Sequence, residues 1–159
     1  MTSDLAAQVL DDLEARGRTL ASAESLTGGG LGSQLTSVSG ASAVYAGGVI
    51  TYATRLKVEL LQVPIEIILG DGAVSAGCAR AMAAGVRTLM GADVGVSTTG
   101  VAGPDRQEGK PAGTVFVAVA DDRGQTVRSL DLPGDREAVR AATVEAALEL
   151  LLSRNSAIR

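Results

Sequence analysis

The sequence predicts an α/β fold: a three-layer α/β/α sandwich with a mixed, mostly parallel sheet, in one domain over residues 1–159. Helix-like periodic segments alternate with short runs of strand-forming residues, which is typical of strands joined by helical crossovers. Near the C-terminal end, Asp122-Arg123-Gly124 is a hairpin turn between two strand-like runs. Apolar residues make up 46% of the chain and aromatic residues only 2%, so an aliphatic core of interior strands under small-faced helices is expected.

Each element has a local signal. Ser3 and Ser75 are suitable N-caps for two helices, and Gly17 and Gly91 follow the ends of those helices. The strands are short runs of apolar and β-branched residues between turn residues. We expect strands at 19–23, 43–52, 93–98, 113–120 and 126–132. We expect helices at 3–16, 31–38, 54–61, 64–70, 75–90 and 135–152.

The composition excludes several kinds of site. The chain has no histidine and one cysteine, Cys78, which rules out an internal disulfide, thiolate–imidazole chemistry and the commonest zinc ligands. Its acidic residues show no calcium-loop spacing, so we expect no metal and no cofactor. The net charge is −4 and the basic residues are dispersed, which argues against a nucleic-acid partner. Because no signal peptide or membrane-length apolar run is visible, we expect a cytoplasmic protein without a membrane partner.

The first candidate site is the segment Ala23-Glu24-Ser25-Leu26-Thr27-Gly28-Gly29. It places Ser25 at a predicted strand-to-helix turn, next to glycines whose backbone N–H groups could hold an oxyanion or a phosphate. The segment is neither a G-x-S-x-G elbow nor a Walker A loop. A glycine-rich connection in which Ser25 or Thr27 caps the helix explains it equally well.

Lys57 is the second candidate, together with Tyr52, because a serine nucleophile without histidine needs another base. A desolvated lysine or a tyrosinate is the available choice. The alternative is a solvated helix lysine and a core tyrosine.

Two further segments have the composition of ligand-binding loops. The run from Thr98 to Thr114 combines Gly, Pro and hydroxyl side chains after a strand, where α/β folds collect ligands, although a plain surface loop remains an alternative. Arg136 and Arg140 lie one helical turn apart near the start of the last helix, after the predicted N-cap Asp135. They could form a fork for a phosphate or carboxylate, or be exposed and solubilising.

Taken in order, these segments resemble the CinA C-terminal domain family, whose stand-alone members include nicotinamide-nucleotide amidase. The resemblance runs from about Leu5 to Leu152 and rests on six short motifs. They are Ala-Glu-Ser-x-Thr-Gly-Gly, Thr-Tyr with a lysine five residues after the tyrosine, Gly-Ala-Val-Ser from Gly72, Thr-Gly-x-Ala-Gly-Pro from Thr99, Lys-Pro-x-Gly-Thr from Lys110, and Pro-Gly-Asp-Arg from Pro133.

The resemblance implies an enzyme that hydrolyses the carboxamide of nicotinamide mononucleotide to nicotinate mononucleotide and ammonia. Carried over by position, Ser25 is the nucleophile and Tyr52 and Lys57 handle protons. The N–H groups of Thr27, Gly28 and Gly29 would stabilise the oxyanion. The small-molecule nucleotide substrate would be held by the remaining site residues, namely Thr99, Gly100, Ala102, Gly103 and Arg140. A small apolar-rich domain of a metabolic enzyme is often a homo-oligomer, and we expect one here.

The sequence departs from the family pattern at four positions, where the family usually has Cys, Asn, His and Glu and this chain has Leu26, Thr54, Asp71 and Ala76. None of these changes removes a proposed catalytic group, but they leave two alternatives open. One is a non-catalytic, regulatory pyridine-nucleotide-binding module. The other is an amidase for another small carboxamide.

Overall fold

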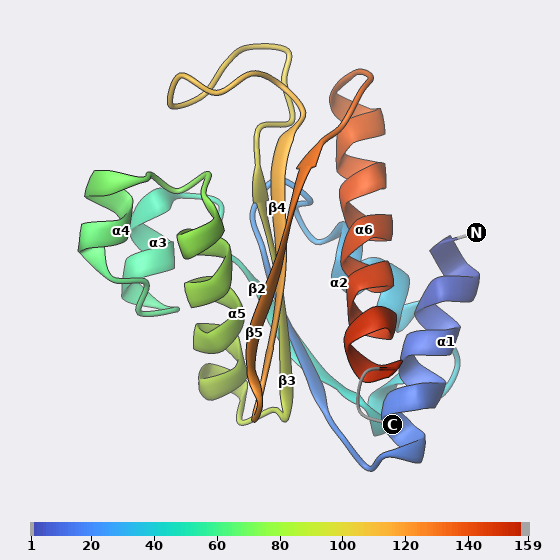
Figure 1. Cartoon of the computed structure of the whole chain (residues 1–159). Helices are drawn as coiled ribbons and strands as arrows, with labels where there is room; N and C mark the ends of the chain where they lie inside the picture. The colour runs from blue at the N-terminus through green and yellow to red at the C-terminus, as the bar shows by residue number, and fades with distance from the viewer. Residues whose placement is uncertain (1, 157–159) are drawn as a thin grey trace.

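In the computed structural model, which describes residues 2–156, one sheet lies between two layers of helices (Figure 1). The sheet has five strands in the order β2-β1-β3-β4-β5. The strands are β1 (Leu20–Glu24), β2 (Tyr45–Ile50), β3 (Val94–Gly100), β4 (Thr114–Asp121) and β5 (Gly124–Asp131).

The sheet is mixed, as the sequence predicts. β1 is parallel to both β2 and β3, whereas β4 is antiparallel to β3 and β5. β5 therefore runs in the direction of the first three strands, and β4 alone is reversed among the strands of residues 2–156. The three-layer α/β/α fold with a mixed, mostly parallel sheet is confirmed.

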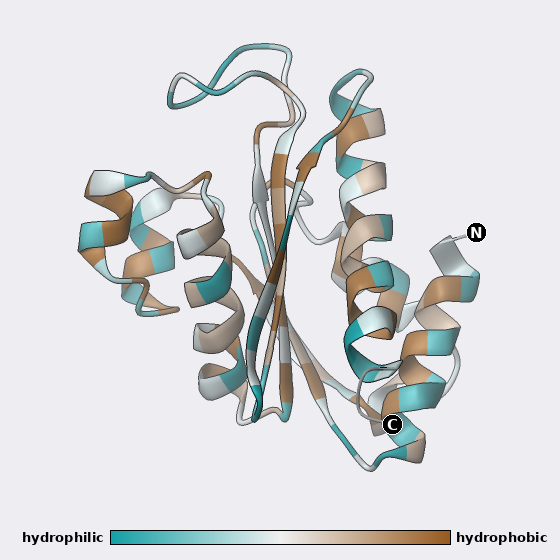
Figure 2. Ribbon diagram, viewed as in Figure 1, coloured by the Kyte–Doolittle hydropathy of each residue, from teal (hydrophilic) through white to brown (hydrophobic). Residues whose placement is uncertain are grey.

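The helices cover both faces of the sheet, α1, α2 and α6 on one and α3, α4 and α5 on the other (Figure 1). Their bounds are α1 (Thr2–Ala15), α2 (Gly30–Thr36), α3 (Thr54–Glu59), α4 (Ile65–Gly70), α5 (Ala76–Met90) and α6 (Arg136–Ser156). Three aliphatic clusters result, one between the sheet and α1, α2 and α6, and two between α5 and the other face of the sheet. In Figure 2, hydrophobic residues recur along α1 and α6 among hydrophilic ones, whereas the long loop after β3 is mostly hydrophilic.

Most predicted boundary signals are present in the structure. Ser75 caps α5 by accepting a hydrogen bond from the Cys78 N–H, and Asp135 accepts one from the Ala138 N–H at the start of α6. The prediction that Ser3 is an N-cap is wrong, because α1 already includes Thr2. In the hairpin, Gly124 belongs to β5, so the turn consists of Asp122 and Arg123.

Gly48 shows why β2 contains two adjacent glycines. A Cβ at Gly48 would lie 2.7 Å from the carbonyl oxygen of Ser22 and would also collide with the Ser22 hydroxyl. The pairing of β1 with β2 shifts register between Leu20 and Ala21. A close approach of the two backbones and an irregularity in their pairing are thus both found between β1 and β2.

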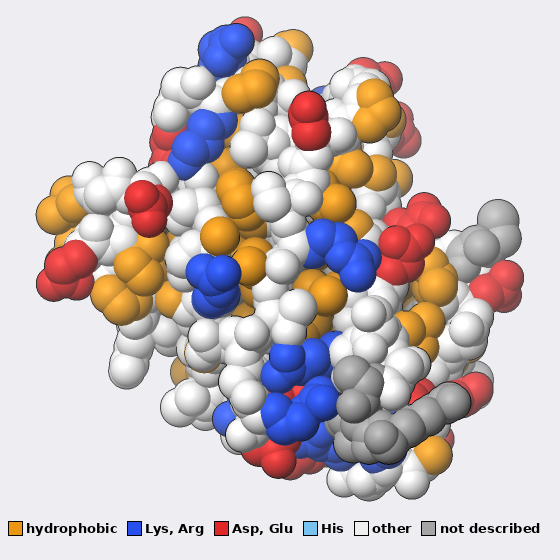
Figure 3. Space-filling view, in the orientation of Figure 1, with side chains coloured by type: hydrophobic (Ala, Val, Ile, Leu, Met, Phe, Trp, Pro, Cys, Tyr) orange, Lys and Arg blue, Asp and Glu red, His pale blue; other side chains and the backbone are white. Residues whose placement is uncertain are grey.

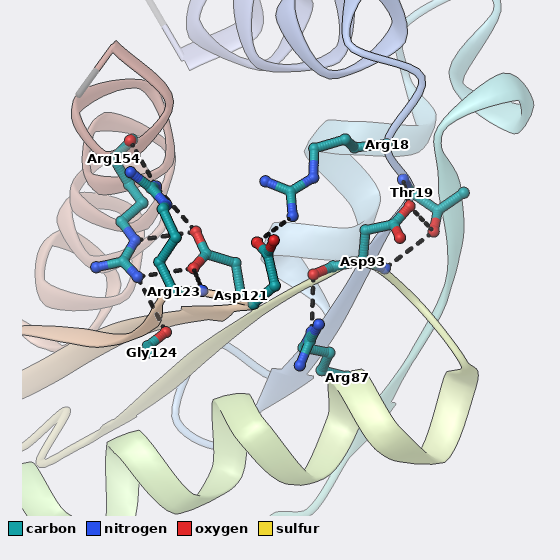
Figure 4. A network of polar contacts seen from close by, with 9 residues as sticks. Arg18, Thr19, Arg87, Asp93, Asp121, Arg123, Gly124 and Arg154 are labelled. Carbon is teal, nitrogen blue, oxygen red and sulfur yellow. Dashed lines mark hydrogen bonds and ion pairs between the residues drawn. The ribbon is translucent and has the colours of Figure 1, made fainter. Parts of the chain in front are cut away.

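The two ends of the sheet differ in chemistry. At the end shown lowest in Figure 1, a polar network surrounds the buried Asp121, which accepts hydrogen bonds from Arg123 and Arg154 (Figure 4). Burial alone would raise the pKa of Asp121, but these two guanidinium groups hold it well below its usual range. Figure 3 shows the acidic and basic side chains gathered there. This polar network lies at one end of the sheet, and the candidate site lies at the opposite end.

Candidate functional site

Ser25 directly follows β1 and lines a cavity of about 350 Å³. Its backbone N–H donates to the Thr98 carbonyl oxygen at 3.1 Å, which ties the turn after β1 to β3. The cavity is formed by the ends of β1 and β3, the start of α3, the segment before α5 and the first residue of α6. Its lining comprises Ser25, Leu26, Tyr52, Thr54, Lys57, Ala73, Val74, Arg136 and residues 99–107.

Lys57 reaches the same cavity from α3. Its side chain is buried, with a relative exposure of 2%, and its Nζ lies 2.9 Å from Ser25 Oγ. Nζ also donates to the carbonyl oxygens of Thr51 at 2.6 Å and Tyr52 at 3.4 Å. The structure thus brings Ser25 and Lys57 together, and Lys57 is not the solvated helix lysine that the sequence left as an alternative.

The surroundings of Lys57 favour its neutral form. Burial lowers the pKa of the Lys57 amine, and the acidic groups of Cys78 and Glu108 offset only part of that effect. A neutral amine has two N–H groups and one lone pair. With the two N–H groups directed at the carbonyl oxygens of Thr51 and Tyr52, the lone pair is free to accept the Ser25 hydroxyl proton. The arrangement suits a general base.

Tyr52 lines the cavity. The residue is 61% exposed, so it is not the core tyrosine that the sequence left as an alternative. Its hydroxyl oxygen accepts a hydrogen bond from Arg136 Nη2 at 3.1 Å. In residues 2–156, the contact of Tyr52 with the Ser25–Lys57 pair is made by its backbone carbonyl. The phenol thus lies at the mouth of the cavity, whereas Ser25 and Lys57 lie inside.

The glycine turn is arranged differently from the sequence expectation. Thr27, Gly28 and Gly29 do not line the cavity. The Gly28 N–H donates to the Ser25 carbonyl oxygen at 3.1 Å, and the Gly29 N–H donates to Glu24 at 3.2 Å. These two N–H groups are therefore already used within the chain.

The carboxylate of Glu24 occupies the position expected for a bound anion. Glu24 is 3% exposed and accepts hydrogen bonds from the Thr27 hydroxyl and from the N–H groups of Gly29, Leu31 and Gly32. The sequence places Glu24 in the candidate segment but does not predict this role. The available signal was a charged residue at the end of a strand that is otherwise apolar or small.

The loop after β3 contributes one wall. Thr99, Gly100, Ala102 and Gly103 all line the cavity, as the sequence predicts for a ligand loop. The Thr99 hydroxyl donates to the Ala73 carbonyl oxygen at 2.8 Å and so joins this wall to the segment before α5.

Glu108, which sequence reasoning missed, makes a second connection to that segment. Its carboxylate accepts hydrogen bonds from the N–H groups of Ala73 and Val74, each at 2.9 Å, and lies 3.5 Å from Lys110 Nζ. Lys110 in turn donates to the carbonyl oxygens of Asp71 and Val74. No sequence pattern identifies a pairing between segments so far apart in the chain.

The two arginines of α6 have separate places. Arg136 lines the cavity and donates to the Gly103 carbonyl oxygen at 2.6 Å. Arg140 lies behind the turn after β1 and donates to the carbonyl oxygens of Leu26 at 3.0 Å and Thr27 at 3.3 Å. It lines a second cavity of about 230 Å³ and not the one with Ser25. The fork expected from their spacing is therefore not formed at the Ser25 cavity.

Within residues 2–156 there is no cluster of His, Cys, Asp and Glu side chains that could ligate a metal ion. The helices of this part of the chain include none with the length and hydropathy needed to cross a bilayer.

Comparison with known proteins shows the family. Residues 2–154 match the CinA C-terminal domain. A CinA-like protein from Frankia casuarinae is 50% identical over 143 residues, which cover 90% of this chain and 33% of that protein. The chain spans about a third of the length of the relatives of this kind that it matches.

Two solved structures have the same fold over nearly the whole of both chains. The crystal structure of a CinA superfamily protein from Klebsiella pneumoniae 700603 has a TM-score of 0.95 and 37% identity, covering 98% of both chains. That of the competence/damage inducible protein CihA from Agrobacterium tumefaciens has a TM-score of 0.93 and 34% identity, covering 97% of this chain and 95% of that one. The chain therefore belongs to the CinA C-terminal domain family.

Proposed function

We propose that this domain hydrolyses the carboxamide of nicotinamide mononucleotide, giving nicotinate mononucleotide and ammonia, with Ser25 as nucleophile and Lys57 as its base. The observation that carries the proposal is the 2.9 Å contact between Ser25 Oγ and a buried lysine amine at the wall of a cavity. The resemblance of the motifs to nicotinamide-nucleotide amidase supplies the substrate.

The reaction has two steps. Neutral Lys57 takes the hydroxyl proton of Ser25 while Oγ attacks the carboxamide carbon, and the resulting tetrahedral intermediate collapses as Lys57 returns the proton to the leaving ammonia. The product of this step is an ester on Ser25. A water molecule then attacks the ester carbonyl, Lys57 accepts one of its protons, and Ser25 leaves with that proton. The carboxylic acid so formed loses its remaining proton to solvent and is released as the carboxylate.

The oxyanion of each intermediate needs a donor beside Ser25. We assign this role to the Leu26 N–H, because Leu26 follows the nucleophile directly and lines the cavity. The hydrogen bonds within residues 2–156 leave this N–H without a partner, in contrast to the N–H groups of Gly28 and Gly29. An N–H group one residue after the nucleophile is also the oxyanion donor in other serine hydrolases.

The phosphate of the nucleotide requires a cation at a distance from Ser25. Arg136 fits best, since it lines the cavity and contacts both Tyr52 and Gly103, which also line it. Arg106 lines the same region. Arg140, the arginine expected from the sequence, is directed at the backbone of the turn and would act on the phosphate only through that turn.

A second candidate is an amidase for another small carboxamide. Thr54 lines the cavity at the start of α3, one turn before Lys57, and it is one of the positions where the sequence departs from the family pattern. A single changed polar contact can redirect specificity strongly.

The test is ammonia release from nicotinamide mononucleotide by the purified protein in the presence of EDTA. We expect release by the parent protein and none by Ser25→Ala or Lys57→Met. Arg55→Ala is the matched control, because Arg55 is an exposed residue of the same helix as Lys57 and pairs with Glu59 at the surface. It should release ammonia at the parent rate.

Three outcomes contradict the proposal. Saturable binding of the nucleotide without ammonia would indicate the non-catalytic module. Release from a different carboxamide in a substrate panel, but not from the mononucleotide, would favour the second candidate. Full activity of Ser25→Ala would exclude Ser25 as the nucleophile.

A further inference from the structure

Glu24 is an anion enclosed within the turn that carries Ser25. Oε1 accepts hydrogen bonds from Thr27 Oγ1 at 2.6 Å, from the Leu31 N–H at 2.9 Å and from the Gly29 N–H at 3.2 Å. Oε2 accepts one from the Gly32 N–H at 3.0 Å. The residue before α2, Gly29, provides no side-chain cap, so the carboxylate of Glu24 satisfies the N–H groups of the first turn of that helix instead.

The carboxylate is balanced by hydrogen bonds and not by a cation. Glu24 is 3% exposed, and no Lys or Arg of residues 2–156 forms an ion pair with it. Hydrogen bonds to a charged acceptor are stronger than neutral ones, and the dipoles at the start of a helix favour a negative charge. The turn is therefore built around this side chain, and its shape depends on the acceptor oxygens of that side chain.

A chain of contacts leads from Glu24 to Ser25. Thr27 Oγ1, which donates to Glu24, is also 2.8 Å from Thr98 Oγ1. The Thr98 carbonyl oxygen accepts the Ser25 N–H at 3.1 Å. Glu24, Thr27 and Thr98 are all buried, and none of them lines the cavity that holds Ser25 and Lys57. Only Thr98 of these three hydrogen-bonds the Ser25 backbone, and the contacts of Thr27 connect it to Glu24.

We propose that Glu24 is a positioning residue for the nucleophile: through Thr27 and Thr98, its buried carboxylate fixes the backbone of Ser25 so that Oγ meets the Lys57 amine. The inference rests on the proposed role of Ser25 and Lys57. A displacement of about 1 Å at a reacting atom can cost on the order of 10²-fold in rate. Because the three residues do not touch the cavity, their loss reduces the rate of the chemical step and leaves substrate binding nearly unchanged.

The experiment measures the reactivity of Ser25 itself, with a fluorophosphonate probe and the purified protein. In this reaction Ser25 Oγ bonds to phosphorus, fluoride leaves, and the hydroxyl proton passes to Lys57. Mass spectrometry identifies the labelled residue and gives the labelling rate. The same proteins are assayed for kcat and KM of ammonia release from nicotinamide mononucleotide, and thermal unfolding monitors folding.

Four variants are compared with the parent protein. Glu24→Gln keeps the shape of the side chain but replaces one acceptor oxygen by an NH₂ group, which faces a donor and cannot accept its hydrogen bond. Thr27→Val removes the hydroxyl that links Glu24 to Thr98, and Thr27→Ser keeps it. Glu149→Gln is the matched control for loss of a carboxylate, because Glu149 lies at the surface of α6, 3.9 Å from Arg128, far from the site.

We expect Glu24→Gln to lower the labelling rate and kcat by on the order of 10²-fold with little change in KM. Thr27→Val should lower both by a smaller factor, and Thr27→Ser should recover most of that loss. Glu149→Gln should behave as the parent. If Glu24→Gln does not fold, the Thr27 pair still decides the question, since both Thr27 variants retain the carboxylate.

The results separate this inference from the proposed function. Labelling of the parent at Ser25 without hydrolysis of any carboxamide would contradict the proposed substrate and leave the positioning role testable by the labelling rates. Labelling of a folded Glu24→Gln, or of Thr27→Val, at the parent rate would overturn the inference. A raised KM with unchanged kcat in Thr27→Val would overturn it too, because that result is expected if Thr27 contacts substrate. Absence of labelling in the parent would contradict both proposals.

Discussion

Two loops at the same edge of the sheet are each held by one carboxylate bound to backbone N–H groups, but the two carboxylates differ in burial and reach. Glu24, in the turn after β1, is 3% exposed and its partners lie three to eight residues away. Glu108, in the loop after β3, has 29% of its side chain exposed and its N–H partners lie 34 and 35 residues away.

The difference separates two tasks. A buried carboxylate with local partners fixes the shape of one turn, and that turn carries the proposed nucleophile, Ser25. A half-buried carboxylate with distant partners joins two segments that form the wall of the cavity, where Ala73, Val74 and Gly103 lie. Loss of the Glu24 carboxylate should strongly reduce both the free energy of unfolding and the reactivity of Ser25. Loss of the Glu108 carboxylate should have smaller effects, because water can hydrogen-bond to part of the N–H groups it leaves.

The largest contrast is expected in stability after truncation. Glu24→Ala leaves three backbone N–H groups and a hydroxyl without their acceptor in a buried turn, at a cost of about 1–3 kcal/mol for each group that stays unsatisfied. We expect a total loss of about 3 kcal/mol or more in the free energy of unfolding. Glu108→Ala should cost about 1 kcal/mol, because water reaches the donors it leaves. Urea denaturation measures both, and equal losses would contradict the contrast.

A second prediction concerns Gly72, which lies against Glu108. Gly72 has φ +90°, and a Cβ there would lie 2.8 Å from Glu108 Cδ and would collide with Oε1. Gly72→Ala should therefore cost about 1–3 kcal/mol from backbone strain, plus the displacement of the Glu108 carboxylate.

The matched control for Gly72→Ala is Gly70→Ala, because a Cβ at Gly70 meets no atom within 4 Å and φ is not positive there. It should change stability by less than about 1 kcal/mol. The double variant Gly72→Ala with Glu108→Ala should lose less than the sum of the single losses, because both remove the same contact. Strict additivity would show that Glu108 does not hold this segment.

The same comparison shows how far the sequence can predict the molecule. The order of helices and strands and the mixed sheet follow from periodicity and turn residues, which are local properties. The meeting of Ser25 with Lys57 was expected, since a serine without histidine needs a base. The roles of Glu24 and Glu108 were not, because a carboxylate that binds backbone N–H groups leaves no periodic pattern and its donors exist only once the turns have formed.

Tyr52 and the two arginines of α6 show the same limit. The family resemblance implied site roles for Tyr52 and Arg140, and helical spacing suggested a fork of Arg136 and Arg140, but neither predicted where their polar atoms point. The contact of Tyr52 with Arg136, and that of Arg140 with the turn after β1, depend on how α6 packs beside the sheet. Packing between layers sets these directions, and a linear pattern does not encode it.

The third prediction is that the contribution of Glu108 to stability depends on pH. Burial would raise the pKa of Glu108, but hydrogen bonds from the Val74 and Ala73 N–H groups and the nearby Lys110 outweigh it, so the pKa lies below its usual value. A carboxyl with a lowered pKa in the folded state stabilises the fold above its unfolded pKa of about 4.3, and this stabilisation is lost as the pH falls through the folded pKa.

Urea denaturation of the parent protein and of Glu108→Gln as a function of pH measures this effect. The difference in the free energy of unfolding between the two proteins should be largest near neutral pH and should shrink in acid. A difference that stays constant from neutral pH to pH values well below about 4.3 would show that the charge of Glu108 does not contribute.

The smallest expected effect links Glu108 to the chemistry. The negative charge of Glu108 raises the pKa of Lys57, against the larger lowering by burial. Replacing Glu108 by Gln removes this charge, so the protonated amine loses a stabilising interaction and the pKa of Lys57 falls further. In the proposed mechanism the amine must be neutral, so kcat/KM should rise with pH through the pKa of Lys57 in the free enzyme. The rising limb should therefore move to lower pH in Glu108→Gln.

Glu66→Gln is the control, because Glu66 is an exposed carboxylate in the first turn of α4 that does not contribute to the pKa shift of Lys57. Its pH profile should match that of the parent. A rising limb that stays in place or moves to higher pH in Glu108→Gln would mean that the charge of Glu108 does not raise the pKa of Lys57. A limb that moves in the expected direction would show that the half-buried carboxylate of Glu108, besides holding a loop, adjusts the pKa of the proposed base Lys57.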